Sequence, residues 1–204
     1  EFEFDSYRLY ESKKYGYLIV YIPIGAPSTG SSTDELIFAG VNKIIIVGYA
    51  GSLRKDIPHG SIVVCTKALR DEGVSHHYIG YGKYIETSPK LRKKIISLMK
   101  KENIKFYVGP TWTIDAPYME TKEEVEYYRK KGILTIEMEA SAMLSVIKRR
   151  NKEGYNVEGG AIFLISDVLD VRDESEYNFI MAEEYKKYNI DESVNAISEV
   201  LKEV

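Results

Sequence analysis

The sequence predicts an α/β domain whose sheet is covered by helices, and two observations carry this prediction. Short runs rich in β-branched residues recur along the chain, and segments with helical periodicity separate them. Several runs have apolar residues on both faces, which is typical of strands in the interior of a covered sheet. The length of 204 residues suits one domain with a substantial core, so we expect residues 1–204 to form a single domain.

Six segments have the composition of strands, because each is short and rich in β-branched residues. They are 17–24 (YLIVYIPI), 43–48 (KIIIVG), 61–66 (SIVVCT), 104–109 (IKFYVG), 133–137 (ILTIE) and 161–166 (AIFLIS). We expect them to form the sheet.

Helix signals lie between these runs. Ser32 and Glu35 have the spacing of a capping box, which predicts a helix over 33–40. Ser88 before Pro89 predicts the start of another helix, because proline suits the first turn.

Three further helices are predicted later in the chain. Thr121 precedes acids and then basic residues, and Gly132 follows them, which matches a helix dipole and its stop. The segments 140–154 and 191–204 have helical patterns as well. Strands therefore alternate with helices, as an α/β fold requires.

Composition limits the classes of function. The net charge of -3 provides no general basic field, so we expect no nucleic-acid partner. No apolar run approaches the roughly 20 residues of a membrane span, and Cys65 is the only cysteine. We expect a cytoplasmic protein that does not enter membranes. The absence of glutamine, with abundant Lys, Glu, Ile and Tyr, favours a thermophilic source.

The regular pattern breaks at three places. Residues 24–37 join a strand end to a helix start through small residues, which suits either an anion site or an ordinary capped connection. Residues 44–53 end a strand in small residues around Tyr49, which suits either a ligand position or a plain strand exit. Asp167 follows a buried-looking strand, either as a helix cap or as an acid with a raised pKa.

Two acids, Glu137 and Glu139, interrupt the apolar run 132–144. Burying a charge is costly unless it is paired or hydrogen-bonded. On a strand, residues at i and i+2 share one face, where both acids could accept hydrogen bonds from the vicinal hydroxyls of a sugar. The alternative is a strand-to-helix junction with solvated acids, which favour the N-terminus of the following helix.

These features lie within six short motifs that occur in a fixed order. The motifs are GAPS (25–28), VGYAGSL (47–53), GSIVV (60–64), IDAPY (114–118), IEMEA (136–140) and ISD (165–167). With them the chain resembles the nucleoside phosphorylase family, which includes purine nucleoside and uridine phosphorylases and related nucleosidases. The likeness is greatest to archaeal uridine-phosphorylase-like members.

The resemblance implies a three-layer α/β/α sandwich around a central mixed, partly barrel-like sheet. It also implies a homodimer or a hexamer built as a trimer of dimers. The substrates would be a nucleoside and phosphate, with phosphate as co-substrate and without a metal or organic cofactor.

The resemblance also implies roles for individual residues. Asp167 would be the catalytic acid at the base, and Glu137, Met138 and Glu139 would bind ribose. The base would lie against Ala50, Gly51, Ile136 and Ser166, and the anion side would include Gly25 and Tyr49.

The chain departs from the family pattern where phosphate is bound. Ile46 stands where an arginine is expected, Tyr49 where a serine or threonine is expected, and Met119 where some relatives carry arginine. We also expect the family's N-terminal phosphate loop to be missing from this sequence. Three hypotheses follow: a phosphorylase, a nucleosidase that uses water, and a nucleoside binder without activity. Signals for a purine and for uridine both occur.

Overall fold

Five strands close into a barrel in the computed structural model, which describes residues 2–4, 7–169 and 190–204. In barrel order the strands are β5 (Ile62–Asp71), β7 (Phe106–Ile114), β8 (Thr135–Glu137), β4 (Lys43–Ser52) and β9 (Glu158–Val168). The ring closes because β9 pairs with both β4 and β5, parallel to the first and antiparallel to the second. β8 is antiparallel to β4 and parallel to β7, so the sheet is mixed.

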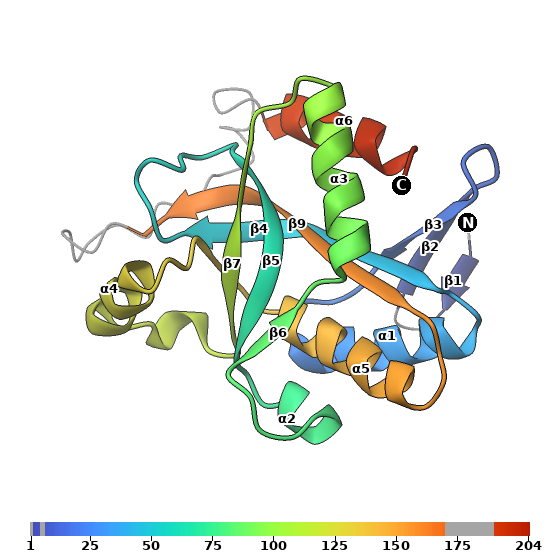
Figure 1. The fold of residues 1–204 in the computed structure, drawn as a ribbon, viewed down its shortest axis with the longest axis horizontal. Helices are drawn as coiled ribbons and strands as arrows, with labels where there is room; N and C mark the ends of the chain where they lie inside the picture. The colour runs from blue at the N-terminus through green and yellow to red at the C-terminus, as the bar shows by residue number, and fades with distance from the viewer. Residues whose placement is uncertain (1, 5–6, 170–189) are drawn as a thin grey trace.

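Helices cover the barrel on two sides, which makes three layers (Figure 1). One side carries α3 (Pro89–Lys101) and α6 (Ile190–Leu201), and the other carries α1 (Ala26–Phe38) and α5 (Ala140–Lys152). The predicted α/β/α sandwich with a partly barrel-like sheet is therefore confirmed. None of the helices in the described ranges is long and apolar enough to span a membrane.

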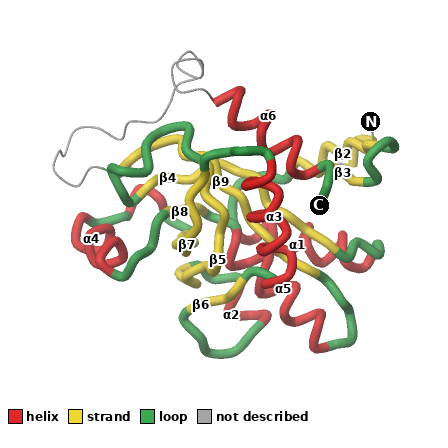
Figure 2. The backbone as a smooth tube through the Cα atoms, turned by 45° about the horizontal axis from the view of Figure 1, so that its top comes forward, coloured by secondary structure: helices red, strands yellow, loops and turns green. Residues whose placement is uncertain are grey.

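The remaining elements lie around this body. β1 (Phe2–Phe4), β2 (Tyr7–Ser12) and β3 (Tyr17–Tyr21) form a separate antiparallel sheet, which extends away from the barrel in Figure 2. The short elements are β6 (Tyr84–Glu86), α2 (Ser75–Tyr78), the 3₁₀ helix η1 (Pro117–Met119) and α4 (Lys122–Lys130).

Strand β9 shows why the sheet needs cover on both faces. Ile162 and Leu164 belong to the buried cluster that includes α3 and α6, whereas Phe163 and Ile165 belong to the cluster that includes α5. Alternate side chains of a strand point to opposite faces, so this apolar run is buried on both faces of the sheet.

All six predicted strands are present, and five of them join the barrel sheet. The expectation that they form one sheet is wrong for 17–24, because β3 lies in the separate sheet, where Leu18, Ile19 and Tyr21 are 45%, 55% and 64% exposed.

The predicted capping box of Ser32 and Glu35 is wrong. Helix α1 begins at Ala26, with Gly25 as its N-cap at φ 106° and a proline in the first turn. Ser32 lies inside the helix, where its hydroxyl donates to the carbonyl of Ser28 at 2.8 Å. A glycine at positive φ followed by proline starts the helix one and a half to two turns earlier than the expected serine.

The other two predicted N-caps, Thr121 and Ser88, are at the expected positions but differ in their hydrogen-bond partners. Thr121 and Glu124 form a complete capping box at the start of α4. Ser88 is the N-cap of α3, but its hydroxyl accepts a hydrogen bond from the backbone N–H of Gly159 at 2.9 Å. Ser88 therefore joins α3 to β9 and leaves the helix N–H groups to other partners.

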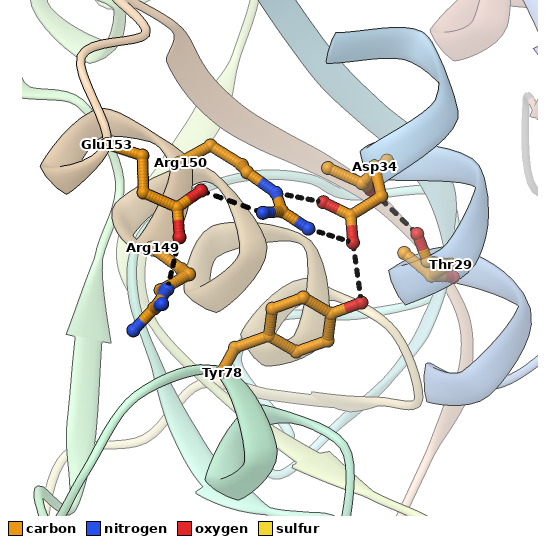
Figure 3. Close-up of polar contacts among 7 residues, drawn as sticks. Thr29, Asp34, Tyr78, Arg149, Arg150 and Glu153 are labelled. Atoms are coloured by element: carbon orange, nitrogen blue, oxygen red, sulfur yellow. Dashed lines mark hydrogen bonds and ion pairs between the residues drawn. The ribbon is translucent and has the colours of Figure 1, made fainter. Parts of the chain in front are cut away.

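An ion pair joins α1 to α5 (Figure 3). Arg150 donates to both carboxylate oxygens of Asp34 at 2.7 and 2.9 Å, and the hydroxyl of Tyr78 donates to the same carboxylate at 2.8 Å. Glu153 accepts a further bond from Arg150 at 2.7 Å. Burial alone would raise the pKa of Asp34, but the Arg150 and Tyr78 bonds hold that pKa below its ordinary value.

Replacing Asp34 with asparagine should destabilise the fold by about 1–3 kcal/mol, because Arg150 loses a bidentate partner in a mostly buried setting. Urea denaturation measures the loss. Asp56→Asn is the matched control, since the Arg54–Asp56 side chains are 43% and 61% exposed and such pairs contribute less than about 1 kcal/mol. Equal losses in the two variants would contradict this account of the ion pair.

Candidate functional site

A β-bulge in β9 positions Asp167, which lies at one end of the candidate site. Ala50 of β4 pairs with Ile165 of β9, but the next residue, Gly51, pairs with Asp167. Ser166 is therefore an extra residue in β9. Bulges redirect side chains and are frequent beside active sites. Here the bulge sets the direction of Asp167, whose carboxylate accepts a hydrogen bond from the Ser166 hydroxyl at 2.7 Å.

Gly51 permits a close approach of Asp167 to β4. A Cβ atom at position 51 would lie 2.8 Å from an Asp167 carboxylate oxygen and 3.0 Å from the Ile136 side chain. Any larger residue would force one of these neighbours to move. The structure thus brings together the residues predicted to face the base, namely Ala50, Gly51, Ile136, Ser166 and Asp167.

The environment of Asp167 raises the pKa of its carboxyl group. The residue is 7% exposed, and burial raises the pKa of its carboxyl group. The hydrogen bond from Ser166 and the charge of His59 act in the opposite direction. A carboxyl group whose pKa is raised in this way is suited to donating a proton or a hydrogen bond.

Glu120 is a second acid near Asp167 that the sequence did not reveal. It directly follows η1 and is partly buried. Burial raises its pKa to about 7, and the negative charges of Asp167 and Glu124 add to the effect. In the sequence it is one of five acids between 115 and 126, so composition could not distinguish it.

The prediction that Glu137 and Glu139 share one face of a strand is wrong. Strand β8 ends at Glu137, and Glu139 is the N-cap of α5 with φ −133°. The structure has the strand-to-helix junction of the alternative, but Glu137 is buried and not solvated. The backbone changes from strand to helix between Glu137 and Ala140. The two acids are therefore not on one strand face, and their carboxylates have different partners.

Glu137 is buried and is bonded by the protein itself. It accepts hydrogen bonds from the Thr113 hydroxyl at 2.5 Å and from the backbone N–H groups of Glu139 and Ala140 at 2.8 and 2.7 Å. Burial raises its pKa to about 7, while the bonds from Thr113 and Ala140 favour the ionised form. Its predicted role as a ribose ligand stays a prediction.

Glu139 is less buried, and its carboxylate spans two backbone groups. One oxygen accepts from the N–H of Gly25 at 2.6 Å, and the other accepts from the N–H of Met138 at 3.2 Å. Burial raises its pKa, and these two bonds lower it. Because each carboxylate oxygen can accept about two hydrogen bonds, each retains capacity for a ligand hydroxyl.

Strand β8 connects the two ends of the site. Ile136 touches Gly51 at the Asp167 end, and Glu139 follows three residues later. Three residues span at most roughly 10 Å, so the backbone of Glu139 lies within that distance of Ile136, which contacts the Asp167 end of the site.

The anion side is less complete. The N–H of Gly25 is directed at Glu139, and Tyr49 is 47% exposed. Ile46 packs against the core, and Met119 is 73% exposed. None of these four residues supplies a cation. In the described part of the chain, no three His, Cys, Asp or Glu side chains are grouped as metal ligands would be.

A family model described as the Phosphorylase superfamily matches residues 2–204, and the chain belongs to this family. A guanosine phosphorylase from Halorubrum lacusprofundi is 29% identical over 62% of this chain and 53% of its own length. A DeoD-type purine nucleoside phosphorylase from Clostridium novyi is 30% identical over 74% of this chain and 64% of its own. A uridine phosphorylase from Haemophilus influenzae is 26% identical over 73% and 57%.

Solved structures agree with this assignment. Uridine phosphorylase from Vibrio fischeri superposes with a TM-score of 0.76 and 27% identity, covering 96% of this chain and 77% of that one. An AMP nucleosidase from Bacteroides thetaiotaomicron shares the fold, with a TM-score of 0.67 and 22% identity over 90% of this chain and 73% of that one. The chain spans between half and two thirds of the length of the curated relatives described above.

Replacing Glu120 with glutamine should change the pH dependence of stability. The ordinary pKa of glutamate is 4.5, and the folded value is about 7, so wild-type protein loses stability as pH rises between these values. The variant lacks this loss. Its thermal midpoint relative to wild type should therefore be higher at pH 8 than at pH 4.

Glu86→Gln serves as the control, because Glu86 is exposed and its removal changes the net charge equally. Thermal scans at both pH values provide the comparison. A pH-independent difference between Glu120→Gln and wild type would show that Glu120 titrates normally.

Proposed function

We propose that this chain is a nucleoside phosphorylase, in which Glu139 binds the sugar and Asp167 acts on the base. The arrangement of these two carboxylates carries the proposal. Asp167 is directed by the β9 bulge, Glu139 occupies the N-cap position of α5, and Ile136 of β8 lies between them in the structure. Membership of the family supports phosphorolysis of a nucleoside as the reaction, and the surroundings of Glu139 and Asp167 support the roles proposed for them.

The chemistry follows from charge. Breaking the N-glycosidic bond places positive character on the sugar and negative charge on the base. In this proposal Asp167 donates a proton or hydrogen bond to the leaving base, while Glu139 holds the sugar hydroxyls in one orientation. A phosphate oxygen then forms a bond to the sugar carbon as the carbon–nitrogen bond breaks. The products are the free base and a sugar 1-phosphate.

The phosphate site needs cations that Ile46, Tyr49 and Met119 do not provide. Arginine is the side chain best suited to bind phosphate, because its planar fork donates two parallel hydrogen bonds. We propose that a neighbouring subunit completes the site, in a homodimer or a hexamer. We also propose that residues 1–204 act as one domain and that the protein works in the cytoplasm.

A second candidate is a nucleosidase, in which water replaces phosphate. The apolar side chain of Ile46 at the expected arginine position favours this alternative, because attack by water needs no anion ligand. The base remains open, since the relatives include purine nucleoside and uridine phosphorylases.

An activity screen tests these proposals. Inosine, adenosine, uridine and methylthioadenosine are each incubated with the protein, with and without phosphate, and free base is measured. Phosphate-dependent release identifies a phosphorylase, and phosphate-independent release identifies a nucleosidase. If no nucleoside is cleaved under either condition, both candidates are wrong.

Replacing Asp167 with asparagine should lower kcat by roughly 10²–10⁴-fold, the usual contribution of a general acid. Asp56→Asn should leave the rate unchanged, because Asp56 is exposed and pairs with Arg54. Wild-type turnover in Asp167→Asn would remove Asp167 from the mechanism.

A further inference from the structure

A continuous chain of buried hydrogen bonds leads from the end of β5 to the start of α5. The hydroxyl of Ser141 donates to Glu72 at 2.6 Å, and its backbone N–H donates to the Thr113 hydroxyl at 3.1 Å. That hydroxyl donates to Glu137 at 2.5 Å. Each of these four residues is at most 5% exposed, so solvent competes little for the bonds.

The outer end of this chain is anchored by Arg70, which is buried. Glu72 accepts from the N–H of Ser75 at 2.9 Å, and the Ser75 hydroxyl accepts from Arg70 at 3.0 Å. Three other hydrogen bonds of the guanidinium go to the carbonyl oxygens of Ile79, Gly80 and Gly82, in the loop that follows α2. A further contact joins the guanidinium to a ring nitrogen of His76, within α2.

The other end of this chain of hydrogen bonds lies at the turn from β8 to α5, which contains Glu139. Glu137 accepts hydrogen bonds from the N–H groups of Glu139 and Ala140. These groups lie at the start of α5, where the helix itself offers them no carbonyl partner. An N-cap side chain usually accepts such bonds itself. Here Glu139 occupies the N-cap but makes no cap bond. The N–H of Ser141, which a capping side chain could take, donates to the Thr113 hydroxyl, and Glu137 takes the two N–H groups before it. The Glu139 carboxylate is thereby left to turn outward, towards Gly25.

We propose that Thr113, Ser141 and Glu72 are positioning residues, which act through Glu137 to hold the Glu139 carboxylate in its binding direction. The proposal rests on the function proposed above, in which Glu139 binds sugar hydroxyls. Such a carboxylate must be held to within about 0.5 Å, and a displacement near 1 Å can cost roughly 100-fold in rate. A buried chain fixed at both ends supplies that restraint.

Thr113→Val tests the proposal, because valine keeps the shape and removes the hydroxyl. Its kcat/KM for a cleaved ribonucleoside should fall about 10- to 100-fold. Binding of the 2′,3′-dideoxy analogue should change less than about threefold, since that analogue lacks the hydroxyls Glu139 would bind. Thr113→Ser restores the hydroxyl and should recover most of the loss.

Thr135→Val is the matched control. Thr135 lies on the neighbouring strand β8, is fully buried, and its hydroxyl has no hydrogen-bond partner among the described residues. The same chemical change there should leave both ligands unaffected. An equal loss in Thr135→Val and Thr113→Val would show that general packing, not the chain, is responsible.

A measurement without ligand separates this proposal from the proposed function. The N–H of Gly25 bonds to Glu139, so its hydrogen exchange reports on that carboxylate from a distant part of the sequence. Thr113→Val should speed exchange at Gly25 at least tenfold while exchange at Ile162, in the core of β9, stays unchanged. Unchanged exchange at Gly25 would overturn the proposal even if the enzyme is active.

Ser141→Ala provides a second route if Thr113→Val does not fold. It removes the bond to Glu72 and leaves the Thr113–Glu137 bond in place. Gly25 exchange should again accelerate, and no change there would overturn the proposed role of Glu72. A wild-type protein that binds no nucleoside would refute the proposed function, and Gly25 exchange would still test the chain.

Discussion

The buried carboxylate of Glu137 is the interaction on which the candidate site depends. It ends β8, starts α5 by accepting two backbone N–H groups, and joins both to β7 through Thr113. An unpaired carboxylate in this position would be very costly, so its bonds fix the local backbone strongly. Because Glu137 and Thr113 accept the first N–H groups of α5, the Glu139 carboxylate makes no cap bond to its own helix. In the proposed function, Glu137 organises the turn and Glu139 binds the sugar.

Much of the fold could be predicted from the sequence, because a strand buried on both faces carries apolar residues on both, as 161–165 does. The start of α1 could not, since Gly25 at positive φ outweighed the capping pattern of Ser32. For the site, the motif resemblance assigned both Asp167 and Gly51 to the base, and the structure places them in close contact. It favoured Glu139 over Glu137 as the sugar ligand but could not reveal what bonds Glu137, because partners such as Thr113 lie far away in the chain. Hydrogen bonds between distant segments leave no periodic signal in sequence.

The two ends of the site use acids in different ways. Asp167 is held by a bulge and a close glycine contact, with burial favouring its neutral form. Glu139 is held by the backbone N–H groups of Gly25 and Met138. Burial raises the pKa of both acids, and the hydrogen bonds that each accepts oppose that shift. The two acids therefore differ in what holds them: a hydroxyl beside a bulge for Asp167, and backbone groups at a helix start for Glu139.

Binding of a ribonucleoside and its 2′,3′-dideoxy analogue to wild type and to Glu139→Gln tests the central claim most directly. Hydrogen bonds to a charged group contribute about 1.5–3 kcal/mol, so wild type should prefer the ribonucleoside by at least about tenfold. Titration calorimetry should show that Glu139→Gln loses most of this preference while its affinity for the analogue is unchanged. An undiminished preference in Glu139→Gln would contradict the assignment of Glu139 as the acceptor of the sugar hydroxyls.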